Sequence, residues 1–318
     1  MADDGRAQMD FEHARRRALF RDVLARLAGR TNQLLSYEEV KQSLELGGPV
    51  YRGVKPVPIK QIVGSVDRYR DFDDEFLPKQ DRTADRWKSI ASAFYHEVSL
   101  PPVRLYKVGE AYFVLDGHHR VSVAREQGQT FIDAEVMEAV SRVPVSGDLR
   151  FEDLEVLHEY RHFLERTRLD EIRPDQRIRF TVTGGYDQLI EHIAMHRYFI
   201  QVDWGRDVGA EQAVAHWYDT VYMPVIEAIR EHQVLADFPH RTESDLYLWI
   251  VEHLYYLQEK EKDVSIEEAA EEYADQFSER PIKKIVRGVK QALEGTPDRS
   301  ESDPQNSNEQ ESLNNDPL

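Results

Sequence analysis

The stretch that decides the fold is Leu100–Ala124, which reads LPPVRLYKVGEAYFVLDGHHRVSVA. Its apolar residues predict a strand over 103–108, a turn at Gly109-Glu110 and a hairpin partner over 111–115. A helix then follows from about His119 to Gln127 and ends at Gly128. The stretch therefore predicts a buried strand that passes through a glycine turn directly into a polar helix start.

The flanking segments extend this unit into an α/β domain. A helix is predicted over 85–95, a strand over 131–136 and extended structure over 50–63, with a loop over 65–80. Further helices are expected at 10–28 and 36–46, after a frayed stretch at 1–9, and then near 151–166, 185–199, 210–232, 243–259, 266–277 and 281–293. The fold class is therefore α+β.

Four regions are expected along the chain. They are N-terminal helices (1–49), the α/β domain (50–145), a helical C-terminal domain (146–294) and a disordered acidic tail (295–318). The junction near 141–148 contains no long flexible linker, so the C-terminal helices are expected to pack beside the loop at 116–120.

Composition excludes several classes of function. The chain of 318 residues has no cysteine, so disulfides, thiolate metal sites and cysteine nucleophiles are excluded. A formal charge of −18 disfavours binding of DNA or an anionic membrane over the whole surface. Neither a transmembrane span nor a signal peptide is recognisable, which makes the cytoplasm the expected location.

The loop Asp116–Arg120 has the chemistry of a phosphate site. Gly117 would let an anion approach the backbone, and the helix start offers free N–H groups and a positive dipole end. His118, His119 and Arg120 add side-chain donors, while Asp116 could bind Mg²⁺ or accept a proton from a hydroxyl. The alternative is that these side chains only pack and cap the turn.

These residues resemble the core of the ParB/sulfiredoxin-like superfamily over about 55–140. The likeness lies in the Pro101-Pro102 strand start, the hairpin and the glycine-led loop ending in Arg120. The resemblance implies that Gly117 to Arg120 hold the phosphates of ATP, ADP or CTP with Mg²⁺. It also implies an NTPase, or a small-molecule phosphotransferase like the free-serine kinases of this fold, with Asp116 as metal ligand or base.

Two departures narrow what the resemblance implies. His118 stands where sulfiredoxins carry their cysteine, which excludes sulfinic acid reduction. His119 replaces the second arginine of the ParB motif, and no helix-turn-helix domain is recognisable. The chain is most similar to bacterial proteins that join such a domain to a helical C-terminal domain. Arg68 and Arg70 lie in the segment that contributes to the nucleotide pocket in this superfamily, with a solvated loop as the alternative.

Other motifs support competing hypotheses. His158-Glu159-Tyr160-Arg161-His162 matches the zincin pattern HExxH, but its charged neighbours disfavour a zinc hydrolase. His192 and His196, four residues apart, could bind a metal or an anion, although a packed helix face is the simpler interpretation. A DNA-associated regulator that uses Arg15–Arg17 and the basic helix 281–293 is the alternative function, and a homo-oligomer stays open.

Overall fold

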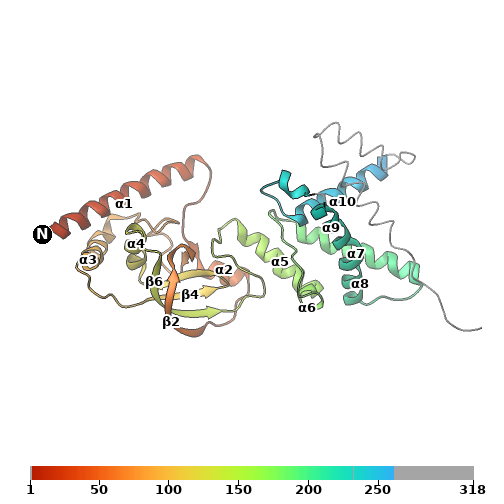
Figure 1. Ribbon diagram of the computed structural model, residues 1–318, viewed down its shortest axis with the longest axis horizontal. Coiled ribbons are helices and arrows are strands. Elements are labelled where there is room, and N and C mark those ends of the chain that lie inside the picture. Colours follow the sequence, from red (N-terminus) through yellow and green to blue (C-terminus); the bar gives the residue numbers. More distant parts are fainter. Residues whose placement is uncertain (1, 232, 261–318) are drawn as a thin grey trace, which may run out of the picture. The chain divides into compact units, whose positions relative to one another are not determined.

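The computed structural model describes residues 2–231 and 233–260 (Figure 1). Its strands form one six-stranded mixed sheet. The strands are β1 (Leu35–Ser36), β2 (Val50–Pro58), β3 (Ile62–Ser65), β4 (Val103–Val108), β5 (Ala111–Asp116) and β6 (Phe131–Ala139). They lie in the order β1-β3-β5-β4-β6-β2, with antiparallel pairs at β4/β5 and β2/β6 and parallel pairs elsewhere. The predicted α+β class is confirmed.

Strand β5 lies in the interior of this sheet and is covered on both faces. Tyr112 and Val114 belong to the core that includes Val121 of the following helix. Phe113 points to the other face, where its ring lies 5.6 Å from that of Tyr37. Burial on both faces explains why the strand reads as a continuous apolar run rather than an alternating one. The predicted hairpin is confirmed, with Val108 paired to Ala111 across the turn.

Three helices form the layer on the Val121 side of the sheet: α1 (Ala2–Leu27), α3 (Ala84–Tyr95) and α4 (His118–Glu126). Phe11, Trp87 and Val123 pack together from these three helices. The helix α2 (Tyr37–Ser43) covers the opposite face and begins at Ser36, whose hydroxyl accepts from the N–H of Glu39, as its capping box predicts.

The N-terminal helix is longer than the sequence predicts. Residues 2–9, expected to be frayed, are helical because they have a surface to pack on. Ala7 is buried against α3, and the guanidinium of Arg6 lies 4.3 Å from the ring centre of Tyr95. Tertiary packing thus overrides a segment whose own composition is polar.

The chain after residue 145 is helical in the described part. Its helices are α5 (Asp153–Thr167), α6 (Leu169–Ile172), α7 (Gly185–Trp204), α8 (Ala210–Trp217), α9 (Met223–Glu231) and α10 (Glu243–Lys260). The single helix predicted over 210–232 is wrong: a π-helical turn at Tyr218–Tyr222 divides it. Pro224 has no N–H to continue the regular hydrogen-bond ladder, which accounts for the break. The predicted helices 266–277 and 281–293 and the tail lie outside the described residues.

Short 3₁₀ turns complete the chain at Ile59–Gln61, Asp81–Thr83 and Val234–Asp237. By its internal contacts the chain divides into two units, residues 1–217 with 240–248, and residues 218–239 with the described residues after 248. This division differs from the four regions expected from the sequence. Those boundaries stay a prediction, although β1 from the first region pairs with β3 from the second.

The junction between the sheet and the helices is tight, as its sequence predicts. The N–H of Glu110 donates to the carbonyl of Val145 at 2.9 Å, and Ser43 of α2 donates its hydroxyl to the carbonyl of Leu154. Helix α5 therefore packs on α2, at the face opposite to α4. Among the described helices, none is long and apolar enough to cross a membrane.

Candidate anion-binding site

The loop between β5 and α4 has a backbone shape that only glycine adopts without strain. Gly117 caps α4 with φ 100° and ψ 22°, in the left-handed region. A Cβ atom at this position would lie 2.6 Å from Cγ1 of Val103, so the strand β4 passes directly against the turn. The turn therefore exposes the N–H groups of the first turn of α4 at the end of a buried strand.

A cavity of about 130 Å³ opens at this helix start. It is lined by Asp67, Arg68, Arg86, Ile90, Leu115, Asp116, Gly117, His118, His119 and Arg120. The structure thus brings together every site residue predicted from the sequence except Arg70. That side chain is exposed, and its guanidinium lies 5.5 Å from the ring of Tyr69. The described helices after residue 150 contribute nothing to the lining, contrary to our expectation.

Two arginines supply the positive charge of this cavity. In the described part of the chain, neither Arg68 nor Arg86 makes an ion pair, although the chain as a whole is strongly acidic. Arg68 follows β3, and Arg86 lies in the first turn of α3, so the two come from different elements. Cations without a carboxylate partner beside free N–H groups favour an anionic ligand.

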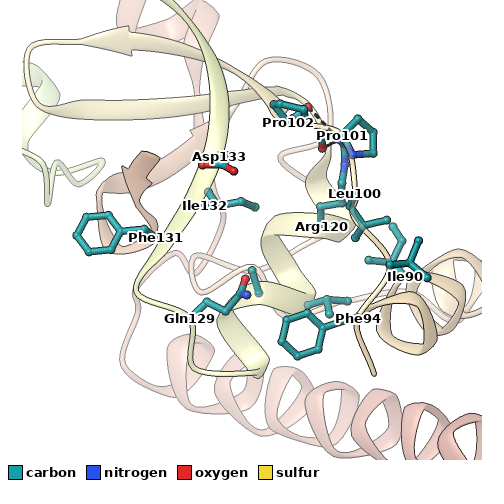
Figure 2. A pocket seen from close by; sticks show the side chains of 13 residues that line it. Ile90, Phe94, Leu100, Pro101, Pro102, Arg120, Gln129, Phe131, Ile132 and Asp133 are labelled. Carbon is teal, nitrogen blue, oxygen red and sulfur yellow. Dashed lines mark hydrogen bonds between the residues drawn. The ribbon is translucent and has the colours of Figure 1, made fainter. Parts of the chain in front are cut away.

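Arg120 differs from these two because its guanidinium is already occupied. It donates to the carbonyl oxygens of Pro101 and Pro102 (Figure 2). It also donates to the carboxylate of Asp116 at 2.6 Å. Only 13% of the side chain is exposed. Arg120 thus ties the start of α4 to the segment that precedes β4, and it holds Asp116 at the mouth of the cavity. These contacts give Arg120 a positioning role.

His118 is part of the wall and is held by the end of β3. Its Nε2 lies 2.7 Å from the hydroxyl of Ser65 and 3.6 Å from the carboxylate of Asp67. Burial lowers its pKa to about 4 despite the nearby Asp67. The imidazole is therefore neutral near pH 7 and contributes hydrogen bonding rather than charge.

His119 lines the cavity and carries a buried polar atom without a partner. The side chain is 4% exposed, and its Nδ1 is buried without a hydrogen-bond partner. Burial, followed by the charges of Arg86 and Arg68, lowers its pKa to about 4. Both arginines line the same cavity as this ring. A buried polar atom without a partner costs about 1–3 kcal/mol, so this ring is a strained part of the cavity wall.

The donor set fits Mg²⁺ only together with a ligand. Asp116 and Asp67 are the carboxylates of the lining, and no group of three or more His, Asp or Glu in the described residues could hold a metal ion. Mg²⁺ is commonly bound by one or two carboxylates together with substrate phosphates. Asp116 remains the candidate protein ligand for such an ion.

The competing motifs have other structural roles. In the zincin-like motif, Glu159 accepts the N–H of Gly184 at 2.8–2.9 Å, at the start of α7, while Nδ1 of His158 bonds the carbonyl of Ser43. Nε2 of His196 lies 2.8 Å from Nδ1 of His216, and His192 lies against Tyr247. These pairs join neighbouring helices, which agrees with a packed helix face.

Asp67, Arg86, Ile90 and Leu115 line the cavity although the sequence did not predict them as site residues, and Arg86 is the cation among them. It is adjacent in sequence to Trp87, whose buried indole belongs to the apolar face of α3. A single exposed arginine on an amphipathic helix has no distinguishing signal. Only the packing of α3 against α4, where Nε1 of Trp87 donates to the hydroxyl of Ser122 at 2.8 Å, brings it to the loop.

Comparison with known families finds one similarity. Residues 187–277 match the family described as Domain of unknown function (DUF4032). The matched segment begins in α7 and lies beyond every residue that lines the cavity at α4. No curated protein matches the chain.

Proposed function

We propose that the chain binds a nucleotide through its phosphates at the loop Asp116–Arg120, with Arg68 and Arg86 as the charged ligands. The observation that carries this proposal is a cavity at the start of α4 that two arginines without ion pairs line, together with His119, whose buried Nδ1 has no partner. The first N–H groups of α4 complete the set of donors. The resemblance of the loop to the ParB/sulfiredoxin-like superfamily supports ATP, ADP or CTP as the ligand, with Mg²⁺.

The proposed reaction, hydrolysis or transfer of a phosphoryl group, rests on Asp116. Its side chain is 55% exposed and lies at the mouth of the cavity. From there the carboxylate could contact the metal ion of a bound nucleotide. Arg120 fixes its orientation at 2.6 Å. In this proposal Asp116 binds Mg²⁺ or accepts the proton of a hydroxyl acceptor.

The alternative, a DNA-associated regulator, gains no support from the described residues. Arg15 is paired with Asp81 and Arg17 with Glu126, each at 3.1 Å, and Arg16 lies 3.9 Å from Glu12. The basic residues of 281–293 lie outside the described part. With the arginines of α1 already paired, the formal charge of −18 disfavours DNA as the ligand.

Thermal unfolding with ATP, ADP, CTP or GTP, each with Mg²⁺, tests the proposal. A nucleotide at a hundred times its dissociation constant should stabilise the fold by about 2.7 kcal/mol. Arg86→Ala should weaken binding roughly ten- to a hundredfold, because it removes a charge-assisted contact.

Arg26→Ala, which removes an exposed arginine from α1, is the matched control and should bind as the wild type does. Absence of stabilisation by all four nucleotides and by inorganic triphosphate would refute the proposal. Equal weakening by Arg26→Ala and Arg86→Ala would also contradict it.

A further inference from the structure

Helix α7 has apolar side chains on two opposite faces. One face is buried in the fold and includes Leu189, Ile193 and Ile200. The other face contains four large apolar side chains that are 48–63% exposed, which we call the α7 stripe: Met195, Tyr198, Phe199 and Val202. Because these residues are three or four positions apart, they are neighbours on one side of the helix. A helix that is apolar on all sides is normally buried, and a contiguous exposed apolar patch marks an interaction site.

Helix α1 has an exposed stripe with the same spacing. Its residues are 48–80% exposed, and we call them the α1 stripe: Phe20, Val23, Leu24 and Leu27. The intervals between successive residues are three, one and three positions in both stripes. Two helix faces with equal spacing can pack side chain against side chain along two helical turns. The α1 stripe therefore has the shape of a partner for the α7 stripe.

The charges that precede the two stripes are opposite in sign. Arg16 lies four positions before Phe20, and Glu191 lies four positions before Met195. The side chain of Arg16 is 82% exposed and pairs only loosely with Glu12, at 3.9 Å. Glu191 is exposed and makes no ion pair with the described residues.

This pattern of charge selects between the possible helix pairs. When the two helices lie parallel with Phe20 beside Met195, Arg16 lies beside Glu191. Two copies of the same stripe, packed parallel, would instead oppose Arg16 to Arg16 or Glu191 to Glu191. Opposed like charges disfavour such pairs, so the complementary partner of each stripe is the other stripe.

We propose that the α1 stripe of one copy packs on the α7 stripe of a second copy of this chain, with Arg16 paired to Glu191. This inference does not depend on the nucleotide site. Because the contact joins two different surfaces, it closes when two copies exchange it reciprocally and otherwise extends into a longer assembly. A patch of two helical turns is at the small end of protein interfaces, which predicts a weak and reversible association.

Sedimentation equilibrium of the full chain at roughly 1–200 µM tests the charge pair, because weak complexes dissociate in this range. The wild type should exceed the monomer mass at the upper end. Arg16→Glu and Glu191→Arg should each raise the dissociation constant about tenfold, and the double variant should return it to within about threefold of the wild type. Arg177→Glu and Glu155→Arg, which reverse exposed charges outside both stripes, are the matched controls and should associate as the wild type does.

Phe20→Ser and Phe199→Ser test whether unlike stripes pair. Each variant alone should be monomeric over the same range, because all its copies lack the same stripe. An equimolar mixture should associate more tightly than either variant alone, since an intact α1 stripe then meets an intact α7 stripe. Both rings are exposed, so the melting temperatures should stay near that of the wild type.

Three results would overturn the inference. A wild type that stays monomeric throughout the range would assign the stripes to a different partner. Association that survives Phe199→Ser would place the contact elsewhere on the surface. A mixture that stays monomeric, although the wild type associates, would mean that like stripes pair.

Discussion

The hydroxyl of Ser65 lies 2.7 Å from Nε2 of His118, and the same oxygen accepts the backbone N–H of Arg68 at 3.0 Å. Ser65 is the last residue of β3 and is fully buried. One hydroxyl therefore sets the position of a histidine in the first turn of α4 and of the arginine that follows β3. The two halves of the proposed phosphate site are held together at this atom.

Ser65→Ala should therefore weaken binding without changing any charge. Loss of one hydrogen bond that orders Arg68 should cost about 1 kcal/mol, or roughly fivefold in affinity for the nucleotide. Calorimetric titration of the variant measures this loss. Ser141→Ala, which removes a hydroxyl that bonds only the carbonyl of Val143, is the control. Unchanged affinity in Ser65→Ala would argue against a site that includes Arg68.

The glycine at the start of α4 should be irreplaceable for folding. Gly117→Ala places a methyl group 2.6 Å from Val103 in a left-handed conformation, so it should destabilise the fold by about 2–5 kcal/mol. Gly128→Ala has φ 69° but no atom within 4 Å, and should cost only about 1–2 kcal/mol. Urea denaturation of both variants measures the loss in unfolding free energy, and the difference between them is the cost of steric overlap beyond that of backbone strain. Equal losses in the two variants would contradict the close approach of β4.

Arg120→Ala should act mainly on stability. It leaves the carbonyls of Pro101 and Pro102 without their charged donor and frees Asp116, which should cost about 1.5–3 kcal/mol of unfolding free energy. Arg120→Lys should recover only part of this, since an ammonium cannot reproduce the fork of a guanidinium. Thermal melts report the loss. A melting temperature equal to that of the wild type would mean that the contacts of Arg120 contribute nothing to folding.

Stability should fall when the solution is acidified below about pH 6.5. The pKa values of His118 and His119 are lowered to about 4 in the fold, whereas an exposed histidine has a value of about 6.5. Between these values the unfolded chain binds protons that the folded chain does not. Each histidine then removes about 1.4 kcal/mol of stability per pH unit.

Urea denaturation at pH 7, 6 and 5 measures this slope. His118→Gln should lower the slope by about 1.4 kcal/mol per pH unit, whatever its effect on absolute stability. Because other titrating groups are common to both proteins, the difference in slope isolates His118. Identical slopes would show that this imidazole is protonated in the folded chain as readily as in the unfolded one.

Local patterns in the sequence predict much of the α/β part of the fold. The hairpin, α3 and α4 are confirmed within one or two residues, because their periodicity and their glycine and proline stops are strong. The predicted site residues that line the cavity are the consecutive Asp116–Arg120 and, through the family resemblance, Arg68. Arg86 is some thirty positions earlier, and only the packing of α3 on α4 brings it to the loop. Sequence spacing contains no information about that contact.

The elements that were predicted wrongly depend on interactions over longer distances. Residues 2–9 are helical because α3 offers them an apolar surface. The division between α8 and α9 depends on one proline within an otherwise helical pattern. The strand order, with parallel pairs β3/β5 and β4/β6, was not predicted, because it depends on pairing between segments that lie far apart in the sequence.

Strand β2 is an edge strand of the described sheet, with a neighbouring strand on one side only. Pro56 and Pro58 have no N–H to donate to a further strand, Lys55 adds a charge, and the register shift between Tyr51 and Val54 bends the outer half. A strand from another copy would find neither a regular ladder nor a flat surface there. In concentrated solution this edge thus protects the protein against the edge-to-edge strand pairing that leads to amyloid-like fibres.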